Sequence, residues 1–299
     1  MSTLREPPVS ETLEAPARED ELPELSDRVT VIRPASSRPQ LELRELWVYR
    51  ELAATFAWRD LKVRYKQSLI GVGWAIIQPV MTMVVFTFIF GTFAHVPSQG
   101  LPYPVFSYSG ILPWTYFASA LGAASGSLAM NSNLVTKIYF PRVLLPLAAI
   151  TVPAVDFVLA SSVLFGLMAY YGLGVGPHVL LAPVFMVLAA VTALGVGLFF
   201  AVINVRYRDV PYAIPFIIQI WLFLSPVIYP IRALHQPWER LILSLNPMSG
   251  VITGFRWSLL GTPPPSPQLV ALSVLSAAAF LAFGLAFFRR SEPRFADTI

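Results

Sequence analysis

The sequence predicts an all-α membrane protein with six transmembrane helices. Of its 299 residues 56% are hydrophobic, the mean hydropathy is +0.63, and only 13% are charged, about half of the share usual in soluble proteins. Carboxylates are also absent from most of the chain, because Asp156, Asp209 and Glu239 are the only acidic residues between Leu61 and Phe288. This composition argues against a soluble enzyme, and the lack of cysteine excludes disulfides and thiolate metal sites.

Residues 1–40 are predicted to form a disordered cytoplasmic tail. They are rich in proline, glutamate, serine and arginine, so they cannot bury enough apolar surface to fold. Residues 41–68 are predicted to form an amphipathic interface helix, with cations on a different face from the apolar residues. A helix in the membrane interface is expected rather than one packed on a cytosolic domain, since the chain offers no such domain. Its apolar residues recur at helical spacing: Leu43, Trp47, Ala54, Trp58, Leu61 and Tyr65.

Six apolar stretches form the predicted transmembrane domain, residues 69–290, and residues 291–299 form a cytoplasmic tail. Each stretch is near the ~20 residues that a spanning helix needs. The expected spans are Leu69–Ala94, Val105–Leu128, Val143–Tyr171, Val179–Ile203, Pro211–Ile231 and Leu269–Phe288.

The cations predict the orientation. Thirteen lysine and arginine residues flank the spans on one side, and only Arg232, Arg240 and Arg256 lie on the other. By the positive-inside rule both termini are cytoplasmic, in the cytoplasmic (inner) membrane of a cell. The net charge of +4 therefore indicates membrane orientation and no nucleic-acid partner.

The segment from Arg232 to Gln268 is too apolar for an ordinary external loop. Two short re-entrant helices are expected there, joined at Asn246-Pro247 and ended by Gly261 and the prolines after it. A seventh span is the other interpretation, but the length and Arg256 disfavour it.

Small residues and prolines give two further expectations. Gly122 and Gly126 form a pair of small residues suited to close helix packing. The fifth span should be kinked or interrupted, and could form the wall of a pathway. It contains four prolines: Pro211, Pro215, Pro226 and Pro230.

The chain offers no catalytic residues and no metal site. It has no phosphate-binding P-loop, and its three histidines lie far apart at expected span ends. Asp156 is the only carboxylate inside an expected span, where it is either a functional group or a structural hydrogen-bond partner. One such group argues against an ion-driven carrier and an intramembrane hydrolase.

Aromatic side chains are candidates for lining a channel. Flat rings can stack on sugars, but tryptophan and tyrosine also belt membrane interfaces, and the two interpretations stay open. The candidates are Trp74, Trp114, Tyr116, Trp221 and Tyr229.

Several motifs together resemble the membrane subunits of ABC-2 type exporters of surface polysaccharides, the O-antigen, capsule and teichoic acid permeases. They occur in family order between about residues 43 and 262, although the acidic tail before residue 40 is longer than expected for the family. The motifs are Arg59–Trp74 with Gln78-Pro79, Asn133–Pro141, Val205–Val210, Leu224–Pro230 and Leu245–Pro247.

The resemblance implies a homodimer bound to two copies of a separate ATPase, which would hold ATP and Mg, with no cofactor on this chain. It also implies a channel along the dimer axis and a short coupling helix that docks on the ATPase. That helix maps onto about Asn131 to Phe140, where a simple hydrophilic turn is the other interpretation. The polar residues there are Asn131, Ser132, Asn133, Thr136 and Lys137.

The resemblance further implies a polysaccharide linked to a polyprenyl diphosphate, entering beside the interface helix. Cationic side chains suit a diphosphate, although attraction to ordinary anionic lipids would explain the same cluster. The candidate entrance residues are Arg59, Lys62, Arg64, Tyr65 and Lys66.

The resulting hypothesis is a permease subunit that exports a lipid-linked, O-antigen-like polysaccharide with energy from its ATPase partner. An ABC-2 exporter of a teichoic acid, a small lipid or a drug is the alternative within transport. A membrane enzyme such as a lipid-phosphate transferase is the alternative of another class, disfavoured by the lack of clustered buried carboxylates and histidines.

Overall fold

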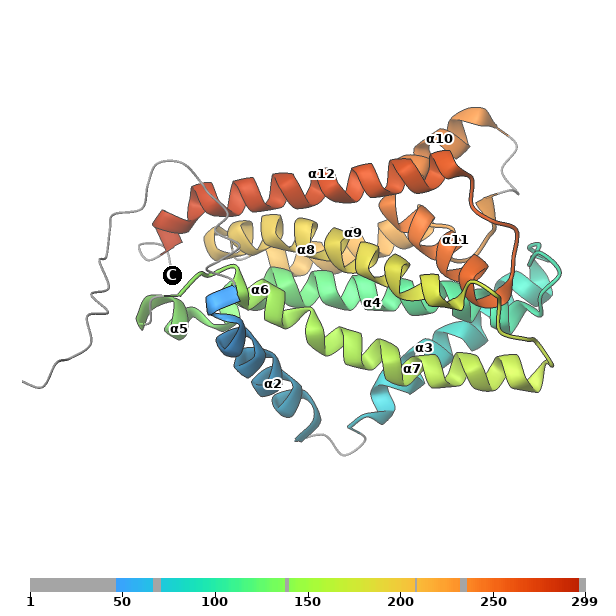
Figure 1. Cartoon of the computed structure of the whole chain (residues 1–299), viewed down its shortest axis with the longest axis horizontal. Coiled ribbons are helices and arrows are strands. Elements are labelled where there is room, and N and C mark those ends of the chain that lie inside the picture. Colours follow the sequence, from blue (N-terminus) through green and yellow to red (C-terminus); the bar gives the residue numbers. More distant parts are fainter. Residues whose placement is uncertain (1–46, 67–70, 138–139, 208, 232–235, 296–299) are drawn as a thin grey trace, which may run out of the picture. The chain divides into compact units, whose positions relative to one another are not determined.

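A computed structural model describes residues 47–66, 71–137, 140–207, 209–231 and 236–295, all within one compact unit, Pro39–Ile299. Every regular element in these ranges is helical, which confirms the all-α prediction (Figure 1). The predicted tail 1–40, parts of the predicted interface helix (41–46 and 67–68) and the end of the C-terminal tail lie outside the described residues. The domain limits proposed from the sequence stay a prediction.

Four helical stretches in the described part of the chain are long and apolar enough to cross a membrane. They are Gly73–Phe93, Leu144–Tyr170, Val179–Arg206 and Pro267–Ser291. The first stretch comprises α3 (Gly73–Phe86) and the π-helical η2 (Thr87–Phe93), and the second comprises α6 (Leu144–Ala149) and α7 (Thr151–Tyr170). The third comprises η3 (Val179–Leu181) and α8 (Ala182–Arg206), and the fourth is α12 (Pro267–Ser291). All four coincide with predicted spans to within a few residues. A short 3₁₀ turn, η5 (Glu292–Arg294), follows α12.

Helix α4 (Tyr103–Met130) is the central helix of the bundle. It has its most extensive contacts with α8 and also packs against α3, α6, α7, α9 (Val210–Phe223) and α11 (Pro247–Leu260). Most of its side chains are buried, including the serines Ser107, Ser109, Ser125 and Ser127. Because protein surrounds it, α4 tolerates more polar residues than a lipid-facing helix, and it is absent from the four strongly apolar stretches although it has 28 residues.

The closest helix approach differs from the one predicted. An added Cβ at Gly122 would meet no described atom within 4 Å, and one at Gly126 would meet only Met130 Sδ at 3.7 Å. Among the described residues of this chain no other helix packs closely on this pair, and its role in helix packing stays a prediction. The tight contact is between α8 and α12, where a Cβ at Gly284 would collide with the carbonyl of Gly195. Spacing of small residues alone did not show which face meets a partner.

The fifth apolar stretch forms a shorter helix than expected. Helix α9 (Val210–Phe223) ends eight residues before Ile231, the predicted end. Pro226 explains the early end, because proline lacks an N–H and disfavours helical geometry in the residue before it. Pro215 remains inside the helix. The interruption predicted from the prolines is present, as a turn after Phe223.

Two short helices follow α9, as the sequence predicts. They are α10 (Pro237–Leu245) and α11 (Pro247–Leu260), with Asn246 between them. Asn246 caps α11 by accepting a hydrogen bond from the Met248 amide at 3.0 Å. Gly261 ends α11 with a positive φ of 63°, a conformation that glycine adopts easily.

Helix α2 (Arg50–Lys66) has apolar side chains on two sides. Phe56 is buried, and Leu52 packs beside it against the cluster that includes Phe140 and Leu144. The predicted apolar face lies opposite, and Trp47 and Trp58 on it are more than half exposed. The helix is therefore not amphipathic in the simple way predicted: one apolar side packs inside the protein, and the tryptophan side is free to meet lipid.

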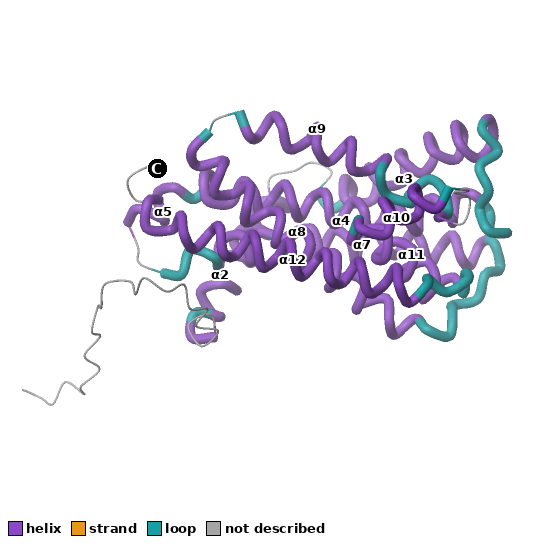
Figure 2. The backbone as a smooth tube through the Cα atoms, turned by 90° about the horizontal axis from the view of Figure 1, so that it is seen from above, coloured by secondary structure: helices purple, strands orange, loops and turns teal. Residues whose placement is uncertain are grey.

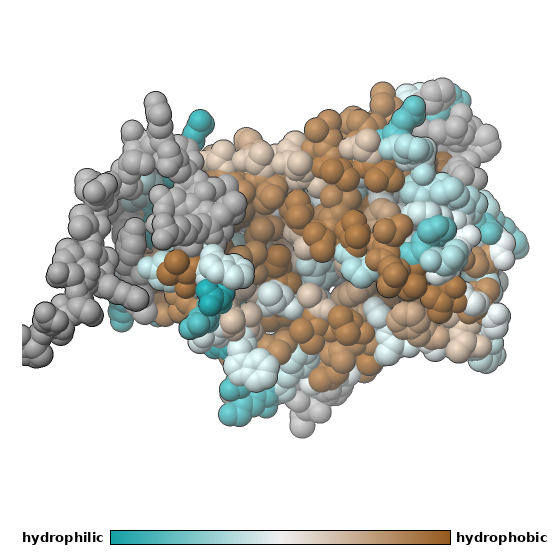
Figure 3. Space-filling model, in the orientation of Figure 1, coloured by the Kyte–Doolittle hydropathy of each residue, from teal (hydrophilic) through white to brown (hydrophobic). Residues whose placement is uncertain are grey.

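Polar and apolar surfaces are segregated. Helices α2, α5 (Ser132–Lys137) and α6 lie at one end of the bundle, and α10 and α11 lie at the other (Figure 1). Figure 2 shows α9 along one margin of the bundle, away from α2. Hydrophobic side chains cover the middle of the face drawn in Figure 3, and hydrophilic ones gather around α2 and near α10. This distribution suits a protein whose middle lies in lipid.

Candidate functional site

An open groove runs along the exposed side of α2. It has a volume of about 400 Å³ and contains three of the five predicted entrance residues. The Lys62 ammonium lies 5.3 Å from the centre of the Trp58 ring, which holds a cation beside an exposed aromatic surface. Such a surface suits the level of lipid headgroups. The groove is lined by Thr55, Trp58, Arg59, Lys62, Val63 and Lys66.

Arg64 and Tyr65, the other two predicted entrance residues, meet on Asp156 of α7. Arg64 Nη2 lies 2.6 Å from Asp156 Oδ2, and the Tyr65 hydroxyl donates a hydrogen bond to Asp156 Oδ1 at 2.5 Å. Both carboxylate oxygens are thus engaged. The one carboxylate of the predicted spans thus has its partners on α2, a pairing that the sequence did not indicate.

The environment of Tyr65 favours its neutral form. Burial of the phenol is the largest cause, and the hydrogen bond to Asp156 adds to it, so that the pKa of Tyr65 rises to about 12. The hydroxyl therefore remains a hydrogen-bond donor at any physiological pH.

A small cavity adjoins this cluster between α2, α3, α4 and α7. Its volume is about 60 Å³, far below the ~300–1,000 Å³ of pockets for drug-sized ligands. Arg64 and Asp156 form one side, and polar side chains from α3 and α4 form another. These polar residues are Gln78, Thr115, Tyr116 and Ser119.

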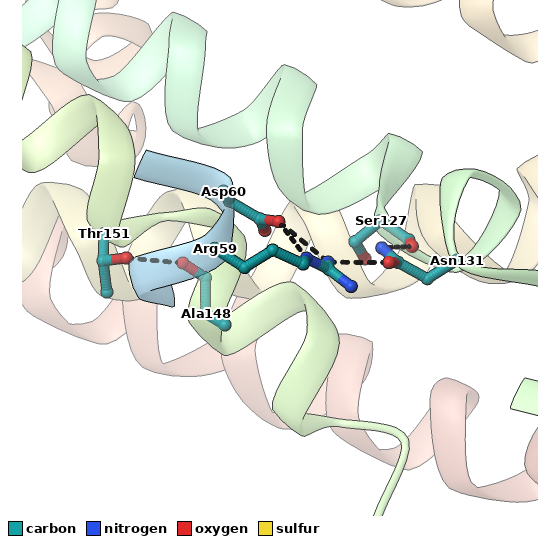
Figure 4. A network of polar contacts seen from close by, with 6 residues as sticks. All are labelled: Arg59, Asp60, Ser127, Asn131, Ala148 and Thr151. Atoms are coloured by element: carbon teal, nitrogen blue, oxygen red, sulfur yellow. Dashed lines mark hydrogen bonds and ion pairs between the residues drawn. The ribbon is translucent and has the colours of Figure 1, made fainter. Parts of the chain in front are cut away.

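Arg59 connects α2 to the start of the predicted coupling segment (Figure 4). It donates to Asp60 Oδ1 through Nε at 2.9 Å and to Asn131 Oδ1 through Nη2 at 2.7 Å. The Asn131 side chain in turn donates to the Ser127 carbonyl at 2.8 Å. A predicted entrance residue is thus bonded to a predicted coupling residue.

The predicted coupling residues form the short helix α5. It extends from Ser132 to Lys137, within the predicted range, and Asn131 lies directly before it. Val135 is buried, whereas Asn133, Thr136 and Lys137 are exposed. An exposed short helix on a buried anchor can dock on a partner, but its role in coupling stays a prediction.

The five candidate channel aromatics occupy different environments. Trp74 is 55% exposed beside the small cavity, whereas Trp114 and Tyr116 are buried in the core of this chain. Trp221 donates its indole N–H to Asn246 Oδ1 at 2.9 Å, and Tyr229 donates to the Phe223 carbonyl at 3.1 Å. They do not share one surface of the single chain, and their role in lining a channel stays a prediction.

Sequence reasoning missed the structural role of Arg256, which it counted as an external cation and used as an argument against a seventh span. The side chain is buried and bonds oxygen atoms from two other segments. It donates to the carbonyls of Phe106, Pro226 and Val227 at 3.1, 2.7 and 2.5 Å. Arg256 thereby joins α11, the start of α4 and the turn after α9. The signal available in the sequence was an arginine within an apolar segment that follows the prolines Pro226 and Pro230.

No cluster of three or more histidine, aspartate or glutamate side chains that could hold a metal ion occurs among the described residues. The polar groups described above are instead cations, hydroxyls and amides around two separate carboxylates, Asp60 and Asp156. Such groups bind anions and sugars by charge and hydrogen bonds.

Comparison with known proteins places the chain in a family. The model of the ABC-2 type transporter family matches residues 51–260. The O-antigen export system permease protein RfbA of Myxococcus xanthus is 31% identical over 260 residues, which cover 86% of this chain and 98% of that protein. A protein of the same name from Klebsiella pneumoniae is 24% identical over 242 residues, covering 81% and 92%.

A further relative is the polysialic acid transport protein KpsM of Escherichia coli, 23% identical over 242 residues that cover 78% of this chain and 91% of that protein. The family match thus extends from the start of α2 to the end of α11. The chain belongs to the ABC-2 type transporter family, as a multi-pass membrane protein.

Proposed function

We propose that this chain is the permease subunit of an ABC transporter that exports a lipid-linked polysaccharide, of the O-antigen type, across the cytoplasmic membrane. The observation that carries the proposal is the match to an O-antigen export permease over 98% of that protein's length. The named cargo of the further relative, polysialic acid, is also a polysaccharide. The shared property is a long, hydrophilic polymer as cargo.

The geometry supports this cargo. A lipid-linked glycan presents its phosphate groups at the headgroup level, where the cations and tryptophans of α2 form the groove. The hydrogen bond from Arg59 to Asn131 connects this groove to the segment before α5. A movement of α5 that an ATPase causes would therefore be transmitted directly to the groove on α2.

The proposed topology has six spans with both termini in the cytoplasm. The two spans beyond the four strongly apolar stretches are α4, enclosed by protein, and α9 with the turn that follows it. Helices α10 and α11 would re-enter the membrane from outside. Their packing on α12, and the hydrogen bond from the Gly250 amide to Ser273 Oγ at 3.1 Å, support this placement.

The proposed complex is a homodimer with two copies of an ATPase that hold ATP and Mg. The sequence contains no P-loop, so the nucleotide needs another subunit. Only 11% of the most apolar part of Gly73–Phe93 is buried, which leaves surface for a second copy and for lipid. ATP could drive export only if its binding changes the relative stability of two channel conformations.

Deletion of the gene tests the proposal. Glycan staining and cell fractionation should show lipid-linked polymer accumulating on the cytoplasmic face while the surface loses it. A plasmid copy of the gene is the control and should restore the surface glycan. Polymer that reaches the surface at normal length after deletion would exclude the proposal and favour export of a small lipid.

A further inference from the structure

Asp156 occupies the position where an anionic ligand of Arg64 would bind. It is the only carboxylate in the four apolar stretches of the described chain, and its side chain is 13% exposed. The Arg64 side chain is 50% exposed, so the guanidinium can be reached from outside while the carboxylate cannot. A cation at the headgroup level is therefore already neutralised by an internal anion.

We propose that Asp156 is a specificity-determining residue, which holds Arg64 so that a lipid diphosphate can engage this cation and a monoanionic phospholipid cannot. The inference rests on the proposed function, because it names the chemical class that this entrance selects. Selection is needed there, since anionic phospholipids are abundant at the cytoplasmic surface and a free arginine would bind them.

The energetics differ between the two ligands. A monoanion that takes Arg64 replaces one singly charged acceptor by another, and it leaves Asp156 with only Tyr65 as partner. Removing the cation from a largely buried carboxylate is unfavourable. Replacement of Asp156 by a singly charged headgroup as the partner of Arg64 therefore costs free energy. An ordinary anionic lipid is rejected because Asp156 competes with it for Arg64, and not because of its shape.

A diphosphate brings more charge and more acceptor oxygens. Arg64 has five N–H donors and, among the described residues, bonds only Asp156, so it can serve a second anion. The adjoining cavity offers further donors, the side chains of Gln78, Thr115 and Ser119, which bond no other described residue. These donors can bind a second phosphate group, which a phosphodiester lacks. At about 60 Å³ the cavity suits part of a headgroup and not a sugar.

Binding of two matched probes tests the proposal. The probes are farnesyl diphosphate and the methyl ester of farnesyl phosphate, which have the same tail and differ in charge and in one phosphate. Their affinities for the purified full-length protein in detergent can be measured by equilibrium retention. Wild type should bind the diphosphate about tenfold more tightly or better. Inorganic diphosphate should compete only weakly with farnesyl diphosphate, because it lacks the lipid tail. Competition by inorganic diphosphate as strong as that by farnesyl diphosphate itself would overturn the assignment to a lipid headgroup.

The informative variant is Asp156→Asn. It should lower the ratio of the diphosphate affinity to the methyl ester affinity about tenfold, mainly because the methyl ester binds more tightly to the released Arg64. Asp156→Glu, which keeps the charge, should retain the wild-type ratio. Glu51→Gln is the matched control, since it removes one carboxylate from an exposed position of α2. An unchanged ratio in Asp156→Asn, an equal change in Glu51→Gln, or no binding by wild type would overturn the proposal.

A second variant keeps the test decisive if Asp156→Asn aggregates. Arg64→Gln should lower diphosphate affinity at least tenfold, and unchanged affinity would overturn the proposal. The gene deletion separates this inference from the proposed function. If deletion removes the surface glycan but the Asp156→Asn ratio is unchanged, the exporter stands and the selectivity of Asp156 fails. If deletion leaves the glycan at the surface, the proposed function fails whatever the probes show.

Discussion

The Arg256 guanidinium lies 3.9 Å from the centre of the Phe106 ring and also donates to the backbone carbonyl of Phe106. One residue at the start of α4 thus binds the cation through both its ring and its backbone. Nη1 and Nη2 also donate to the turn after α9, at the carbonyls of Pro226 and Val227. The carbonyls that a proline-interrupted helix leaves without partners are satisfied by a side chain of α11.

Replacement of Arg256 should destabilise the protein. Arg256→Met keeps much of the volume but leaves several buried carbonyls without donors, each costing about 1–3 kcal/mol. We expect a loss of about 2–4 kcal/mol in the free energy of unfolding, and a smaller loss for Arg256→Lys, whose ammonium keeps three donors. Unfolding in detergent followed by tryptophan fluorescence measures both. Equal stability of Arg256→Met and wild type would contradict this role.

Glycine substitutions should separate the true helix contact from the predicted one. Gly195→Ala would place a Cβ 2.5 Å from the Leu281 amide nitrogen in α12, and the overpacking should cost about 1–3 kcal/mol. Gly122→Ala, the matched control in α4, meets no described atom within 4 Å. It should be neutral or stabilising by up to about 1 kcal/mol, because alanine favours helix. Thermal unfolding of the two variants gives the comparison, and equal losses would refute it.

Tyr65 should make stability depend on pH in the alkaline range. Its pKa is raised from 10.0 to about 12, so folding favours the neutral phenol. The stabilisation is fully present below pH 10 and is lost as pH rises through about 12. The difference in stability between wild type and Tyr65→Phe should be constant up to pH 10 and shrink above it. The difference in tyrosinate absorbance between the two proteins should show a titration near pH 12; a midpoint near 10 would contradict the buried hydrogen bond.

The contact between Arg59 and Asn131 should appear as a coupling energy. In a double-mutant cycle, Arg59→Gln and Asn131→Ala should be non-additive by about 0.5–3 kcal/mol, because the second change removes a contact already lost. Denaturant unfolding of wild type, both single variants and the double variant measures this energy. Arg50→Gln combined with Asn131→Ala is the additive control. Additive effects of Arg59→Gln and Asn131→Ala would show that the contact contributes nothing.

Charge reversal on the groove should affect export. Lys62→Glu places an anion beside Trp58, where it repels phosphate groups, and surface glycan should fall several-fold. Lys62→Gln should be less affected, since it removes the charge without adding repulsion. Membrane fractions must contain normal amounts of each variant. Normal export by Lys62→Glu would remove this residue from the entrance.

Much of the helical order follows from local sequence. Four of the apolar stretches, the junction at Asn246 and the turn at Gly261 depend on residues near each other, and the structure has them where they were predicted. The partners of Asp156 and Arg256 could not be predicted, because they come from segments about 30 to 150 residues away. The packed side of α2 was missed for the same reason, since Phe56 meets Phe140 only in the folded chain.

The enclosure of α4 also has a consequence for how the protein is made. Several of its polar partners follow it in the chain: Asn204 of α8 donates to the Ser125 carbonyl at 3.0 Å, and Arg256 of α11 donates to Ser109 Oγ at 3.3 Å. A chain interrupted before α8 would therefore hold α4 without these partners. The enclosure of α4 is completed only when α8 and α11 have been synthesised.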